Sequence, residues 1–100
     1  MISIDFSIAY RQAGELAQCA EELFHQCNKL EKTIADVRSA WSGETSAAYA
    51  KKLEAFRVQL QKDAAQCRDE AISFRSKINE LKKMEAEMAL ALSALSEGAR

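Results

Sequence analysis

The chain has 100 residues, enough for a single domain (1–100), and its lack of proline and its three glycines allow few turns. Its formal net charge is −1 with both signs interspersed, which argues against binding nucleic acid. No apolar run approaches the roughly 18 residues of a membrane-spanning helix, so we expect no stable membrane insertion. The first residues lack the basic start and apolar run of a cleaved signal peptide.

The first predicted element is an amphipathic helix over about residues 8–41. Asp5 or Ser7 is a suitable N-cap, because either side chain can accept hydrogen bonds from free backbone N–H groups. Two apolar rows, each repeating every seventh residue, are typical of a helix that packs on another helix. The rows are Leu16, Leu23, Leu30 and Val37, and Ala20, Cys27, Ile34 and Trp41.

The pattern stops at a predicted turn over residues 41–45. Gly43 is the only glycine between residues 15 and 97, and glycine can adopt a positive φ without a Cβ clash. Ser42 can cap the next helix, and Glu44 places a negative charge at its positive end. The end of one helix and the start of another therefore fall within a few residues.

A second helix is predicted over about residues 45–97, with Gly98 as its C-terminal stop. Its apolar residues again repeat every seventh position, and a second series lies three or four positions further on. The two series are Leu53, Leu60, Cys67, Phe74, Leu81, Met88 and Leu95, and Phe56, Ala64, Ala71, Ile78, Met84 and Leu92. We predict an all-α fold in which the two helices form an antiparallel hairpin, resembling a coiled coil.

The two predicted helices are unequal in length. If the chain folds back at Gly43, the start of helix one lies opposite residue 78 of helix two. The rest of helix two is then predicted to have no neighbour in its own hairpin. An uncovered apolar stripe is usually an interaction surface. We therefore predict a partner interface formed by Leu81, Met84, Met88, Leu92 and Leu95.

A second packing face is predicted on helix one, where Ala13, Ala17 and Phe24 lie outside the main rows. Alanine-lined faces allow helices to approach closely, which favours an antiparallel homodimer in the form of a four-helix bundle.

The sequence offers no catalytic constellation, so we expect no enzyme, no cofactor and no metal. It has one histidine, His25, and no Gly-rich phosphate loop. The three cysteines are an odd number, which fits small buried apolar side chains better than a disulfide framework. Numbering about Gly43 would place Cys19 opposite Cys67, whereas Cys27 is too far along the helix to pair with Cys67.

The tripeptide Trp41-Ser42-Gly43, at the midpoint of a proline-free helical chain, resembles the motif of the small Trp-Xaa-Gly (WXG) proteins of type VII secretion, the ESAT-like family. The resemblance covers essentially the whole chain. It implies hairpins that pair into four-helix-bundle dimers and are exported without a cleaved signal peptide by a membrane ATPase of mycobacteria and Gram-positive bacteria. Trp41 and Gly43 occupy the motif positions, which implies that the WXG turn takes part in export recognition.

Two functions follow from this resemblance. The first is a secreted substrate or structural partner of a type VII (ESX-like) system, cytoplasmic before export. It would pair with itself or with a related helical hairpin or toxin leader. The second is an intracellular helical adaptor or chaperone that delivers a Leu-Xaa-Gly (LXG) toxin to the machine. The usual C-terminal Tyr-Xaa-Xaa-Xaa-Asp/Glu signal is absent, because no tyrosine follows Tyr49.

Overall fold

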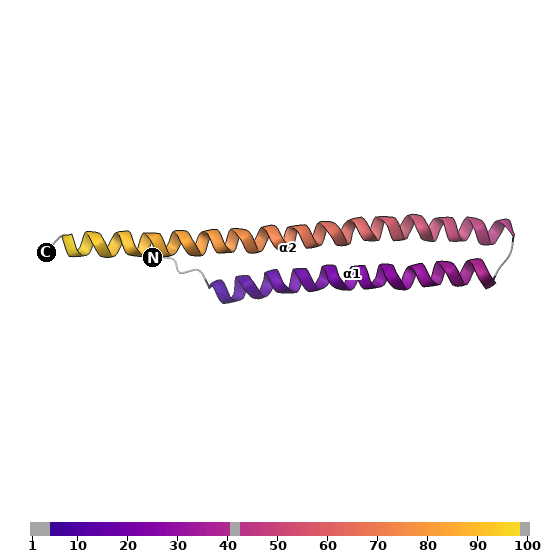
Figure 1. The fold of residues 1–100 in the computed structure, drawn as a ribbon, viewed down its shortest axis with the longest axis horizontal. Helices are drawn as coiled ribbons and strands as arrows, with labels where there is room; N and C mark the ends of the chain where they lie inside the picture. The colour runs from indigo at the N-terminus through magenta and orange to yellow at the C-terminus, as the bar shows by residue number, and fades with distance from the viewer. Residues whose placement is uncertain (1–4, 41–42, 99–100) are drawn as a thin grey trace.

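The computed structural model describes residues 5–40 and 43–98 and confirms the all-α hairpin. Helix α1 spans Phe6–Ala40 and helix α2 spans Glu44–Gly98. The helices run antiparallel, side by side, and α2 continues well beyond the start of α1 (Figure 1). The result is a rod of 87 × 16 × 15 Å. The observed helix ends lie within two residues of those expected from the sequence.

Asp5, one of the two N-caps that the sequence suggests, caps the start of α1. Its Oδ1 atom accepts hydrogen bonds from the backbone N–H groups of Ser7, at 3.1 Å, and Ile8, at 3.3 Å. The Ser7 hydroxyl donates to the same oxygen at 2.8 Å. Because these bonds satisfy N–H groups that have no partner within the helix, α1 begins at Phe6 rather than at residue 8.

Gly43 forms the described part of the turn, and its φ of 101° is the only positive value among the described residues. Its carbonyl accepts the first hydrogen bond of α2, from the Ala47 N–H group at 3.2 Å. The buried Ser46 hydroxyl then donates to the carbonyl of Val37 in the last turn of α1, at 3.3 Å. Glu44 occupies the first turn of α2, as expected. Trp41 and Ser42 lie outside the described residues.

The two helices meet along a narrow seam of small side chains. The buried apolar residues lie on a seven-residue repeat in each helix: Ala13, Ala20, Cys27 and Ile34 on α1, and Ala50, Ala64, Ala71 and Ile78 on α2. The Cys27 Sγ lies 4.0 Å from the backbone oxygen of Arg57, so these two positions face each other. One heptad away, in opposite directions along the two helices, this register brings Ala20 opposite Ala64. Alanines at facing positions let the backbones approach closely.

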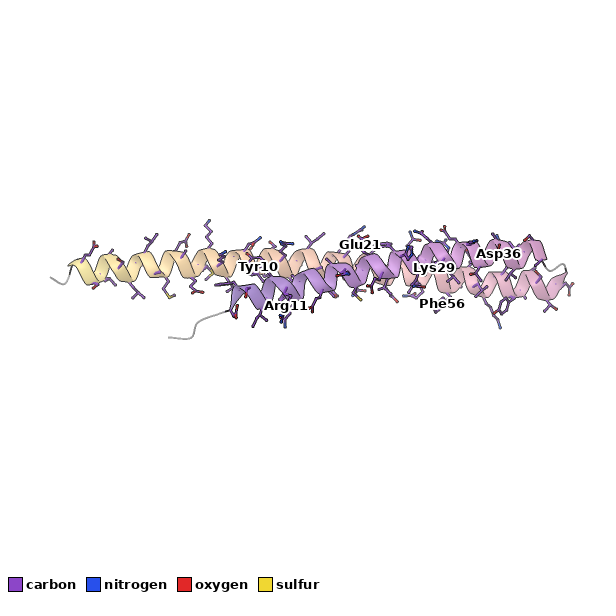
Figure 2. All side chains as sticks on the ribbon, turned by 90° about the horizontal axis from the view of Figure 1, so that it is seen from below. Tyr10, Arg11, Glu21, Lys29, Asp36 and Phe56 are labelled. Carbon is purple, nitrogen blue, oxygen red and sulfur yellow. The ribbon has the colours of Figure 1, made fainter. Side chains whose placement is uncertain are left out.

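The prediction that Phe56 packs in the seam beside α1 is wrong. Phe56, labelled in Figure 2, is 61% exposed, whereas the repeat of Ala50 and Ala64 passes through Arg57. The Arg57 side chain is only 17% exposed. Successive residues are rotated by about 100° around a helix. The prediction chose the aromatic Phe56, one position before Arg57, and this placed it on a direction about 100° away from the seam.

The seam ends at the N-terminal end of α1, near residue 78 of α2, as the sequence predicts. Ile78 is the last buried residue of α2, and the Tyr10 hydroxyl donates to Oδ1 of the adjacent Asn79. Beyond this contact, all the described residues of α2, 79–98, are exposed. We call residues 79–98 the overhang; it is the orange-to-yellow end of α2 in Figure 1.

Candidate functional site

The seam divides the surface of the hairpin into two sides. A residue three positions after a buried one is rotated by about 300° around the helix, and a residue four positions after it by about 400°. The first therefore leans to one side of the seam and the second leans to the other. Because α1 and α2 run in opposite directions, equivalent rows from the two helices lean to the same side.

The first side is apolar and is formed by rows that the sequence predicts. It consists of Leu16, Leu23, Leu30 and Val37 from α1, and Leu53, Leu60, Cys67 and Phe74 from α2. All are half-buried except Phe74, which is exposed. The exposed rings of Tyr49 and Phe56, each one residue before the buried row, flank the same side. We call this surface the apolar side.

The opposite side is closed by cations over aromatic rings. The Arg68 guanidinium lies 5.2 Å from the centre of the Phe24 ring. The Arg75 guanidinium and the Lys82 ammonium each lie 5.7 Å from the centre of the Tyr10 ring. Each such contact stabilises by about 0.5–1 kcal/mol at an exposed site. We call this surface the charged side. Phe24, Arg68, Arg75 and Lys82 each lie four positions after a buried seam residue, and Tyr10 lies three positions before Ala13.

Arg57 lies in the seam, and its guanidinium reaches carboxylates on the charged side. Its Nε and Nη2 atoms donate to Oε1 of Glu54 at 3.1 and 2.5 Å, and its Nη1 donates across the hairpin to Oε1 of Glu31 at 3.2 Å. The hydrogen bond from Arg57 lowers the pKa of Glu54, and the same bond raises the pKa of Arg57. Sequence reasoning missed this cluster, although Arg57 lies seven residues from both Ala50 and Ala64.

The predicted second packing face is corrected by these contacts. Ala13 is buried in the seam itself, and Phe24 is covered by Arg68 on the charged side. Ala17 is exposed between them. A charged group therefore already covers the aromatic ring on this face of α1.

All three cysteines are free thiols. Cys27 is buried in the seam, and Cys67 is half-buried on the apolar side. Cys19 is exposed, because it precedes the seam residue Ala20 by one position, so the predicted facing of Cys19 and Cys67 is wrong. The residues that line up across a hairpin depend on which side chains pack in the seam, and not on the centre of the turn.

The other predicted site residues fall into two groups. Of the WXG turn only Gly43 is described, and it has the positive φ that the motif position suggested. The predicted interface residues Leu81, Met84, Met88, Leu92 and Leu95 all lie exposed on the overhang, far from the turn (Figure 1). The structure therefore places the two predicted sites at opposite ends of α2.

Within residues 5–40 and 43–98, no helix is both long and apolar enough to cross a membrane. The same residues contain no group of three or more His, Cys, Asp or Glu side chains that could hold a metal ion. What they do present is long, patterned helix surfaces.

The class of protein that this geometry defines is a small two-helix hairpin with exposed apolar side chains along its helices. The chain belongs to the WXG100 family, described as proteins of 100 residues with WXG, and the match covers residues 1–69. Comparisons with curated proteins and with solved structures found no match. Members of the family are small helical proteins associated with type VII secretion, and they typically pair with themselves or with related helical proteins.

Proposed function

We propose that the chain is an exported substrate or structural partner of a type VII secretion system, and that it acts through helix contacts rather than catalysis. In this proposal a second hairpin, either a copy of this chain or a related one, covers the apolar side and completes a four-helix bundle. The pair leaves the cytoplasm through the membrane ATPase of the system, without a cleaved signal peptide.

The observation that carries this proposal is the asymmetry between the two sides of the seam. On the charged side, cations already cover the rings of Tyr10 and Phe24. On the apolar side, the two facing rows remain accessible to solvent: their side chains are half-buried, and Phe74 is exposed. Covering this surface would remove additional apolar area from water, at about 25 cal/mol per Å². Family membership supports a helical partner as the cover.

A matched pair of variants tests the proposal without disturbing the hairpin. Phe56 and Ile72 are both on α2 and are 61% and 63% exposed, but Phe56 flanks the apolar side whereas Ile72 faces away from it. We expect Phe56→Glu to weaken pairing by at least about tenfold, because a buried charge costs several kcal/mol, and Ile72→Glu to leave it unchanged.

The readout is particle mass by sedimentation equilibrium, followed by secretion from a host that carries a type VII system. Wild-type chain should form a particle of twice its 11.1 kDa mass, alone or with a co-expressed related hairpin. Phe56→Glu should lose both the pairing and the secretion. A wild-type chain that stays at 11.1 kDa with every related hairpin tested, or equal behaviour of the two variants, would contradict the proposal.

A further inference from the structure

We propose that the overhangs of two copies of this chain pair with each other in an antiparallel arrangement, with Met88 on the twofold axis. This contact uses residues that continue the α2 row of the apolar side beyond α1, and that lie beyond the residues matched by the family. Its occupant is a second copy of the chain, and it would join hairpins tail to tail.

The apolar stripe of the overhang is symmetric about its middle residue. Its members Leu81, Met84, Met88, Leu92 and Leu95 are separated by three, four, four and three positions. In an antiparallel pair centred on Met88, Leu81 therefore lies opposite Leu95. The same register puts Met84 opposite Leu92, and Met88 meets its own copy. A twofold contact requires this kind of self-complementary patch.

The stripe also continues the packing already present in the hairpin. Leu81, Met88 and Leu95 extend the seven-residue row of Leu53, Leu60, Cys67 and Phe74, and Leu92 extends the buried row by two heptads beyond Ile78. An antiparallel helix already packs on these rows as far as Ile78. An antiparallel overhang from a second copy would continue the line of α1 along α2.

The length of the overhang fits the space that it would fill. Residues 79–98 form about 20 residues of helix, which span about 30 Å. With Met88 at the centre, residue 98 of one copy lies opposite residue 78 of the other, where α1 of that other copy begins. The second overhang therefore ends where α1 starts, and the two helices meet end to end without overlapping.

Charge favours the same register. The last turn of α2 has no basic residue, and Glu97 adds to the negative pole of the helix C-terminus. In the proposed pair, this end lies beside residues 75–83 of the other copy. That segment holds four cations against one carboxylate: Arg75, Lys77, Lys82 and Lys83 against Glu80.

Cysteine cross-linking tests the register directly. The variants are Met88→Cys and, as a control, Leu90→Cys, each in a chain whose native cysteines are replaced by alanine and whose helix content is checked by circular dichroism. Met88 is 59% exposed and lies on the stripe, whereas Leu90 is 72% exposed and lies about 200° further around the helix. Under mild oxidation, Met88→Cys should form a covalent dimer at least about ten times faster than Leu90→Cys, because a disulfide needs Cα atoms within about 7 Å.

Two further measurements complete the test. Leu81→Cys should cross-link with Leu95→Cys when the two are mixed, and neither should cross-link efficiently alone. The Met88→Cys experiment is repeated with Phe56→Glu added: persistence of the cross-link supports tail pairing even if the apolar-side pairing fails. Equal rates for Met88→Cys and Leu90→Cys, or a cross-link that forms only when a different protein is added, would overturn the inference.

Discussion

Residues 44–78 and 79–98 of α2 continue one heptad pattern but carry different side chains. Beside α1, the innermost positions are mostly alanine: Ala50, Ala64 and Ala71. In the overhang the stripe consists only of leucine and methionine. Small residues suit a neighbour held close by a short turn, whereas long and adaptable ones suit a partner that arrives from another chain. The difference lies in the innermost row, which is mostly alanine beside α1 and continues as Glu85 and Leu92 in the overhang, whereas the flanking row carries large side chains in both segments.

The largest expected effect comes from enlarging the small seam. Ala64 is fully buried, so Ala64→Leu has no room and should lower the free energy of unfolding by about 1–3 kcal/mol. Ala89→Leu, at an exposed position of the overhang, should change it by no more than about 0.5 kcal/mol. Urea unfolding followed by circular dichroism measures both. Equal losses would mean that the two segments of α2 pack alike.

The turn that keeps α1 beside α2 can be weakened at Gly43. Gly43→Ala should destabilise the hairpin by about 1–3 kcal/mol, because a side chain is strained at a φ of 101°. Gly14, inside α1 with open space around it, is the control: Gly14→Ala should stabilise by about 0.5–1 kcal/mol. Opposite shifts in melting temperature are expected. Shifts of the same sign would show that the turn does not depend on the glycine conformation.

At the turn end of the hairpin, the Ser46 side chain links the two helices by a hydrogen bond. Ser46→Ala removes the hydrogen bond to the Val37 carbonyl and should cost about 1 kcal/mol. Thr45→Ala, at the exposed neighbouring position, should have a smaller effect. Hydrogen exchange of the first turns of α2 would show faster opening in Ser46→Ala alone, and identical exchange in both variants would contradict this role.

The smallest effect is expected at Asp5, where the paired part of the molecule gives way to the overhang. The hydrogen bond from the Ser7 hydroxyl, followed by the Ile8 N–H bond, lowers the pKa of Asp5. A lowered folded pKa means that the contribution of the cap is complete above the ordinary value of about 3.9 and is lost as the pH falls through the folded value. Ser7→Ala should move the pKa, measured by NMR titration, back towards the ordinary value. An unmoved pKa would contradict the role of Ser7.

Much of this fold follows from the sequence because breakers are so rare. With no proline, and one glycine in the middle of the chain, the turn has one place to form, and the heptads on either side require a partner helix. The point where the seam ends, near residue 78, also follows, because each helix rises by the same distance per residue. The row Leu16, Leu23, Leu30 and Val37 follows from the seven-residue repeat, and all four side chains are half-buried.

The details of the seam could not be predicted in this way. Hydropathy favours Phe56 over Arg57, yet Arg57 lies in the seam because its long stem is covered while its guanidinium reaches Glu31 and Glu54. The pairing of Tyr10 and Phe24 with cations was also missed, since it depends on the register between helices. A shift of one residue there rotates every side chain by about 100°, and nothing local in the sequence fixes it.

The single turn also sets the order in which the hairpin can assemble. At the closed end Ser46 meets Val37, nine residues away in the chain, whereas at the open end Tyr10 meets Asn79 across 69 residues. Closing a short loop costs less conformational entropy than closing a long one, so the first contacts form beside Gly43. Each new layer of the seam then needs only a small further closure. Helix pairing should therefore form first at the turn and propagate towards Tyr10, and unfolding should begin with loss of the Tyr10–Asn79 hydrogen bond.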